Sequence, residues 1–245
     1  MTSTADLPVL GLIVPPQHGQ VPSDGPALYG GRVRFVARGL GLGEISTRGY
    51  EEVIDRVIGL AGELTQDGAR AISLMGTSLS FFRGAAFNDE LESEMARRTG
   101  VPCTTMSHAI VRGLRALGIA RVAVATAYID DVNRRLVRYL AASGIETTSI
   151  EGLAITGVRE VGEVPTDALV ALCERVHAAE PDPDGILISC GGLLTLDAIG
   201  IVEARLGVPV VSSSPAGFWD LMRVAGLDSR SAAGGRLFTL PAAPG

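Results

Sequence analysis

The chain has 245 residues, of which 47% are hydrophobic and 20% charged, and its formal net charge at pH 7 is −6. These proportions are typical of a soluble α/β enzyme, and the negative charge disfavours binding to nucleic acid or to an anionic membrane surface. No apolar stretch approaches the roughly 18–20 residues that span a bilayer, and the N-terminal residues lack the pattern of a secretion signal. We therefore expect a cytoplasmic protein that binds neither nucleic acid nor membrane.

The three cysteines are Cys103, Cys173 and Cys190, and they form neither a CxxC pair nor a zinc-binding spacing with the three histidines. An odd number of cysteines in a cytosolic chain favours free thiols over disulfide bonds. The sequence thus predicts no metal site, and it leaves open which of the thiols takes part in chemistry.

Short apolar runs that predict strands alternate with amphipathic segments that predict helices. In chain order these are the strand Val9–Val14, the helix Tyr50–Leu64, the strands Ala71–Met75 and Val122–Ala125, the helices Asp131–Ala142 and Thr166–Ala178, and the strand Ile186–Ser189. The strands are almost without polar residues, as in sheets that are covered on both faces. The alternation predicts parallel sheets with helices on both sides.

The chain also repeats itself in a fixed order. The matched pairs are Leu7–Val14 with Arg121–Thr126, Ile72–Ser78 with Leu187–Leu193, Thr99–Ser107 with Leu206–Ser214, and Ala109–Leu117 with Ala216–Val224. Chance reuse of a Gly-Val-Pro turn is the alternative, but several pairs in one order favour duplication. We therefore predict an α/β fold of two pseudo-symmetric halves, each a parallel β-sheet flanked by helices, with the active site in the cleft between them. Residues 1–117 with 215–245 would form the first half, and residues 118–214 the second.

Small polar residues follow three of the predicted strands. These segments are Gly76-Thr77-Ser78, Thr126-Ala127-Tyr128 and Cys190-Gly191-Gly192. Ligands of open parallel sheets bind beyond the carboxyl ends of the strands, so two facing halves would bring the three segments to one cleft.

Among the cysteines, Cys190 is the candidate for chemistry, because it closes a strand and precedes two glycines that let backbone N–H groups approach a ligand. Such N–H groups near the start of the next helix would favour an anion and depress the pKa of the thiol. Cys173 lies in mid-helix and Cys103 at the start of a strand, where a free cysteine usually serves as a small hydrophobic residue.

The hydroxyl groups of Thr77, Ser78 and Tyr128 are suited to donate hydrogen bonds to a carboxylate or an enolate oxygen. The alternatives are a helix N-cap for Thr77 and Ser78, which is compatible with anion binding, and a rim aromatic for Tyr128.

Long strings of this sequence carry a family resemblance. They are Gly11–Pro16, Gly39–Gly43, Ser73–Phe81, Ala125–Asn133, Ser189–Asp197 and Ser212–Trp219. With the matched halves, they resemble the aspartate/glutamate racemase superfamily and, over almost the whole chain, its arylmalonate decarboxylase family. Racemases of the superfamily place one cysteine in each half, whereas here the counterpart of Cys190 is Gly76. The resemblance therefore implies protonation from one side only.

The resemblance further implies a carboxy-lyase that decarboxylates aryl- or alkenyl-substituted malonates without a cofactor, through an enediolate that Cys190 protonates. The implied oxyanion or carboxylate donors are Thr77, Ser78, Tyr128 and the backbone N–H groups of Cys190 and Gly191. The implied apolar pocket consists of Pro15, Leu42, Ile45, Tyr50, Val158 and Gly192. Donating a proton requires a thiol, whereas the helix start favours a thiolate, and a pKa near the working pH would serve both needs.

Two other functions stay open. The chain could be a maleate isomerase-like or racemase-like enzyme, with Cys103 as a further thiol, or a non-catalytic protein that closes two lobes on a carboxylate. The expected ligand in every case is a small diacid or carboxylate, and the expected state is a monomer.

Overall fold

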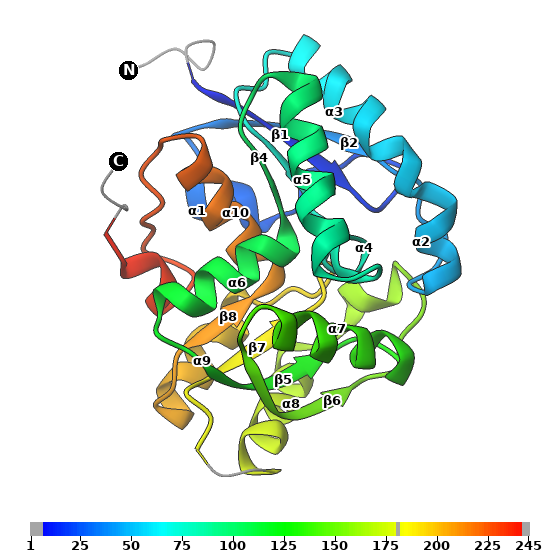
Figure 1. Ribbon diagram of the computed structural model, residues 1–245. Helices are drawn as coiled ribbons and strands as arrows, with labels where there is room; N and C mark the ends of the chain where they lie inside the picture. The colour runs from blue at the N-terminus through cyan, green and yellow to red at the C-terminus, as the bar shows by residue number, and fades with distance from the viewer. Residues whose placement is uncertain (1–6, 180–181, 242–245) are drawn as a thin grey trace.

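The computed structural model describes residues 7–179 and 182–241 (Figure 1). Its strands are β1 (Val9–Val14), β2 (Arg34–Gly39), β3 (Ile72–Leu74), β4 (Cys103–Thr105), β5 (Arg121–Thr126), β6 (Glu146–Gly152), β7 (Gly185–Ser189) and β8 (Val210–Ser212). Its α-helices are α1 (Asp24–Tyr29), α2 (Thr47–Val53), α3 (Val57–Gln66), α4 (Thr77–Phe81), α5 (Ala85–Thr99), α6 (Met106–Ala116), α7 (Asp130–Ala142), α8 (Thr166–Ala179), α9 (Leu196–Leu206) and α10 (Ser213–Val224). Short 3-10 turns complete the list: η2 (Ile54–Arg56), η3 (Glu160–Glu163) and η4 (Arg236–Thr239).

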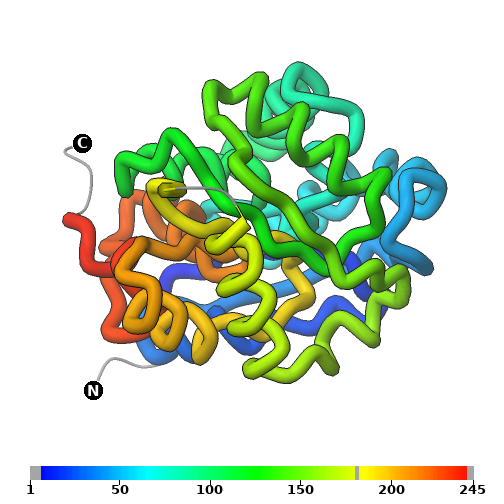
Figure 2. The backbone as a smooth tube through the Cα atoms, turned by 90° about the horizontal axis from the view of Figure 1, so that it is seen from below, coloured from blue at the N-terminus to red at the C-terminus, as the bar shows by residue number. Residues whose placement is uncertain are grey.

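The strands form two four-stranded parallel sheets with the same internal order, β2-β1-β3-β4 and β6-β5-β7-β8. This confirms the α/β fold of two pseudo-symmetric halves. In the view from below, the second half lies in front of the first (Figure 2).

The strand registers also show which residues of the two halves are equivalent. Leu74 lies beside Ile13, the fifth residue of β1, and Ile188 lies beside Ala125, the fifth residue of β5. Two residues further along, Gly76 therefore occupies the place of Cys190. In the same way, β4 and β8 end at equivalent residues, so that Met106 and Ser213, which open α6 and α10, correspond.

Helices cover both sheets, as the alternation of elements predicts. Helices α3 and α5 pack on the first sheet and α8 and α9 on the second, while α6 and α10 lie between the sheets and touch both β4 and β8. An ion pair with a buried carboxylate fixes α6 to α10: Arg112 Nη1 donates to Asp220 Oδ2 at 2.7 Å, and Thr104 Oγ1 of β4 donates to the same oxygen at 2.6 Å. These contacts attach α10 to α6 and β4 of the first half.

Two details differ from the sequence-based expectation. The single helix predicted for Tyr50–Leu64 is divided into α2 and α3 by η2. The edge strands β2 and β6 were not predicted, because most of their residues are only partly buried and give no continuous apolar run. Among the described residues, no helix is long and apolar enough to cross a membrane.

Candidate active site

A cavity of about 620 Å³ opens where the carboxyl ends of the strands of both halves meet. It contains every residue proposed from the sequence except one: Pro15, Leu42, Ile45, Thr77, Ser78, Tyr128, Val158, Cys190, Gly191 and Gly192 line it. The exception is Tyr50, which is fully buried beneath the lining layer. The three polar segments thus come to one cleft.

Cys190 directly follows β7 and is 6% exposed, so its thiol is almost closed off from water. Burial raises the pKa of Cys190 to about 11, and the nearby Gly192 backbone and Tyr128 hydroxyl, which favour the thiolate, offset only part of this rise. The expectation of a depressed pKa was wrong. Helix α9, the next helix along the chain, does not begin until Leu196, and desolvation is the largest influence on the pKa of Cys190. A pKa raised in this way favours the thiol form of Cys190 at neutral pH.

The hydroxyl donors come from two elements. Thr77 and Ser78 open α4, whose N-cap is Gly76, and both are buried. The Thr77 hydroxyl donates to Met106 Sδ at 2.8 Å.

Tyr128 follows β5, is 1% exposed, and has a hydroxyl without a hydrogen-bond partner among the described residues. Burial raises its pKa well above the ordinary value, and the negative charge of an ionised Cys190 would raise it further. The nearby hydroxyls of Ser189 and Thr77 offset this only in part, and neither reaches hydrogen-bond geometry. Tyr128 therefore stays a neutral donor.

Of the two backbone N–H groups expected to bind a ligand, that of Cys190 is not free to do so. The Cys190 N–H donates to Ser213 Oγ at 3.2 Å, so this group is already bonded. The Gly191 N–H makes no hydrogen bond within the described part of the chain. It can point to a ligand oxygen, whereas Cys190 N–H would first have to leave Ser213.

The rest of the lining is mixed: loops of both halves contribute an apolar wall, and His18 and Arg159 also line the cavity. Pro15, Leu42, Ile45 and Val158 come from loops of both halves, and these loops meet at a hydrogen bond from Ile45 N to Thr156 O of 2.9 Å. Tyr50 does not line the cavity, and its ring packs edge-to-face on Phe82.

The remaining cysteines lie outside the cavity. Cys103 is buried in β4 and Cys173 in α8, and burial raises their pKa values to about 11 and about 12. The structure therefore leaves Cys190 as the one thiol lining this cavity. Within residues 7–179 and 182–241, no three His, Cys, Asp or Glu side chains gather as a metal site would require.

The sequence analysis missed several residues at the site. Met75 and Asp24 line the cavity, and Met106 and Ser213 contact its donors from behind. The repeat carried a signal for the last two, because they are equivalent residues that differ in chemistry between otherwise similar strings.

Comparison with known proteins bears on this arrangement. A sequence model of the arylmalonate decarboxylase family matches residues 10–238. The arylmalonate decarboxylase of Bordetella bronchiseptica is 57% identical over 235 residues, covering 96% of this chain and 98% of that protein. A crystal structure of a doubly substituted arylmalonate decarboxylase in its liganded form has a TM-score of 0.93 and 57% identity, over 94% of this chain and 98% of the other. The maleate isomerase of Pseudomonas putida S16 has a TM-score of 0.89 at 23% identity, over 95% and 98% of the two chains.

Two like parallel sheets with one cleft between them define an α/β fold that the arylmalonate decarboxylase and maleate isomerase structures share. The shared fold does not distinguish these two groups of enzymes, but the sequence match over nearly the whole chain does. The chain belongs to the arylmalonate decarboxylase family, and it is an enzyme.

Proposed function

We propose that this enzyme decarboxylates aryl- or alkenyl-substituted malonates to chiral monocarboxylates, without a cofactor and by one-sided protonation from Cys190. The observation that carries the proposal is the asymmetry of the cavity. One buried thiol, protonated at neutral pH, lines it from the second half, and the equivalent place in the first half is Gly76. Membership of the arylmalonate decarboxylase family supports the choice of substrate class.

In the proposed complex, one carboxylate accepts hydrogen bonds from Thr77, Ser78, Tyr128 and the Gly191 N–H. The other carboxylate faces the apolar wall of Pro15, Leu42, Ile45 and Val158. A carboxylate that loses its water there is destabilised by several kcal/mol, on the order of the cost of an uncompensated buried polar group. Its release as neutral carbon dioxide removes this destabilisation.

Cleavage of the carbon–carbon bond leaves its electron pair on the remaining fragment, which becomes an enediolate. The donors that held the first carboxylate now hold the developing oxyanion, and the aryl or alkenyl group delocalises the charge. Cys190 then gives its proton to the α-carbon, which forms the carbon–hydrogen bond and leaves a thiolate. The buried thiolate is unfavourable, as its raised pKa indicates, so it recovers a proton from water before the next turnover.

The test is carbon dioxide release from phenylmalonate and 2-methyl-2-phenylmalonate by the purified protein in the presence of a chelator. We expect release from both substrates and one enantiomer of 2-phenylpropionate from the second. Cys190→Ala and Cys190→Ser should lower kcat by roughly 10²- to 10⁴-fold, which is the range for removal of a general acid.

The matched control is Cys103→Ala, which removes a buried thiol outside the cavity and should leave kcat unchanged. Absence of carbon dioxide release, or full activity in both Cys190 variants, would refute the proposal. Interconversion of maleate and fumarate without carbon dioxide release would point to isomerisation, and binding of the diacid with no product at all would point to a carboxylate-binding protein.

A further inference from the structure

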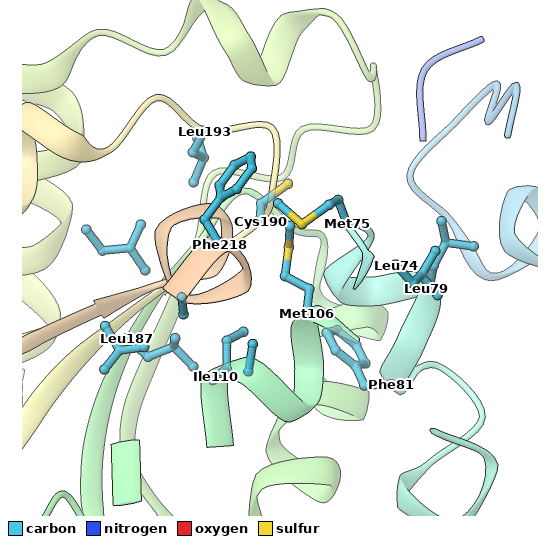
Figure 3. Packing of buried hydrophobic residues seen from close by; sticks show 14 of the residues in the cluster. Leu74, Met75, Leu79, Phe81, Met106, Ile110, Leu187, Cys190, Leu193 and Phe218 are labelled. Atoms are coloured by element: carbon cyan, nitrogen blue, oxygen red, sulfur yellow. The ribbon is translucent and has the colours of Figure 1, made fainter. Parts of the chain in front are cut away.

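Met106 is a fully buried methionine that touches catalytic groups from both halves. It is the first residue of α6, and its sulfur accepts the hydrogen bond from the Thr77 hydroxyl at 2.8 Å. Figure 3 shows its side chain and that of Met75 turned toward Cys190. The mechanism described above gives Met106 no part.

Met106 also lies against Gly191. A Cβ atom added to Gly191 would lie 2.8 Å from Met106 Sδ and 3.0 Å from its Cε, which is closer than real contacts allow. Gly191 therefore packs directly on the thioether. One side chain thus contacts a hydroxyl donor of the first half and the glycine that carries a backbone donor of the second.

The repeat shows that this contact belongs to a pattern. Ser213, the equivalent of Met106, opens α10 and accepts the Cys190 N–H at 3.2 Å. In each half, the first residue of the helix after the fourth strand (α6 after β4, α10 after β8) accepts a hydrogen bond from a residue just beyond the third strand (β3 or β7). The second half holds the thiol-bearing residue in this way, and the first half holds Thr77.

We propose that Met106 is a positioning residue for decarboxylation: its sulfur holds the Thr77 hydroxyl in place at the cavity wall, by a hydrogen bond that the hydroxyl gives up when an oxyanion forms in the cavity. The inference rests on the proposed function, because it assigns the Thr77 hydroxyl to the oxyanion site. Ser107, the next residue of α6, supports it by donating to the Thr77 carbonyl at 2.9 Å, so that α6 fixes Thr77 at two atoms.

The choice of sulfur has a chemical reason. In α4, the helix that contains Thr77, the Ser80 hydroxyl donates to the backbone carbonyls of Gly76 and Thr77 at 3.1 and 2.8 Å. A thioether is a weaker acceptor than a carbonyl, so it orients the Thr77 proton without retaining it strongly. When an oxyanion forms in the cavity, the hydroxyl exchanges the weak bond for a stronger, charge-assisted one.

Met106→Leu tests this directly, because it nearly conserves volume and removes the acceptor. We expect kcat for 2-methyl-2-phenylmalonate to fall about tenfold, with KM little changed. This is a smaller loss than the about 100-fold fall in kcat expected for Thr77→Val, which removes the donor itself. Met106→Leu combined with Thr77→Val should be no slower than Thr77→Val alone, since the methionine acts through the hydroxyl. Met95→Leu, at another fully buried methionine, is the control and should behave as the wild type.

Met106→Ile, which also lacks an acceptor, serves as the second variant if Met106→Leu fails to fold. The inference would be overturned if the folded Met106 variant had the kcat of the wild type. It would also be overturned if the Met106 substitution lowered kcat by the same factor in the wild type and in Thr77→Val. Those results are distinct from failure of the proposed function, in which the wild type itself releases no carbon dioxide.

Discussion

The two halves of the molecule have the same strand order and differ at the ends of equivalent strands. In the first half, Gly76 follows β3 and the next helix begins at once with Thr77, so hydroxyl groups enter the cleft at a helix start. In the second half, Cys190 follows β7, and a glycine-containing loop runs on to α9 at Leu196. The first half therefore presents two hydroxyl groups at a helix start, whereas the second presents the thiol of Cys190 together with the Tyr128 hydroxyl and the Gly191 N–H.

This difference shows how a duplicated fold can support a one-sided reaction. Two thiols facing each other would protonate and deprotonate both faces of a carbon atom. In the proposed reaction, glycine in one of the two places means that the carbanion formed by carbon dioxide loss meets a proton donor on one face only. The strand registers make this comparison testable, because they place Gly76 and Cys190 at equivalent positions.

The largest effect is expected when the thiol is moved from one half to the other. A Cβ at Gly76 would lie 2.8 Å from Leu79 Cδ1 and 3.1 Å from Leu79 Cβ, so a cysteine there requires the buried Leu79 side chain to shift, while the backbone itself needs no glycine. Gly76→Cys combined with Cys190→Ser should form the opposite enantiomer of 2-phenylpropionate. At position 76 the thiol lacks the neighbouring groups that surround Cys190. We therefore expect kcat to be roughly 10³-fold lower, within the range for loss of a general acid.

Chiral chromatography of the product measures the outcome, and Gly76→Cys alone is the companion variant. With a thiol on each face, it should give a product approaching the racemate. The same enantiomer from the double variant as from the wild type would show that the two positions do not face opposite sides of the substrate.

The next largest effect concerns a donor that the second half places in the cleft. Tyr128→Phe removes a buried hydroxyl that has no partner among the described residues, and it should lower kcat about 100-fold with little loss of stability. Tyr139→Phe is the control, since its hydroxyl accepts from Asn88 Nδ2 at 3.0 Å and Tyr139 does not line the cavity. Steady-state kinetics would contradict the assignment if the two variants had similar kcat values.

The sequence predicted the fold and the three polar segments of the cavity from local patterns, whereas the apolar part of the lining came from the family resemblance. Apolar runs identify central strands, and small polar residues after them identify the cleft. What it could not predict depends on packing across long distances. The pKa of Cys190 is set by burial rather than by a helix start, the Cys190 N–H is bonded to Ser213, and Tyr50 does not line the cavity.

A smaller effect would test which half contains α10. Arg112→Met leaves the buried Asp220 carboxylate with Thr104 but without its cation. Loss of one partner from a buried pair costs about 3–5 kcal/mol, and we expect about 1–3 kcal/mol here, because Arg112 is partly exposed. Urea unfolding measures the change, and Arg175→Met, at an exposed pair with Glu151, should have little effect.

Hydrogen exchange in the Arg112→Met protein sharpens this test. If residues 215–245 fold with the first half, amides of α6 and α10 should lose protection together while β5 and β7 keep theirs. Loss of protection in α10 together with β7, and not with α6, would place the C-terminal helix in the second half.

The smallest effect is expected from pH over the neutral range. The folded-state pKa of Cys190 is raised to about 11, and the active form is the thiol, so kcat/KM should not decline from pH 7 to 9 through this group. It should fall about tenfold per pH unit above the pKa, where the thiol is lost. The raised pKa also means that the folded state holds this proton more tightly than the unfolded chain. Its contribution to stability is therefore complete below the unfolded pKa near 9 and disappears as the pH rises through about 11. The pH dependence of kcat/KM and of thiolate absorbance, compared with Cys190→Ala, measures both effects. A thiolate at Cys190 at neutral pH would contradict the assignment of this residue as the resting proton donor.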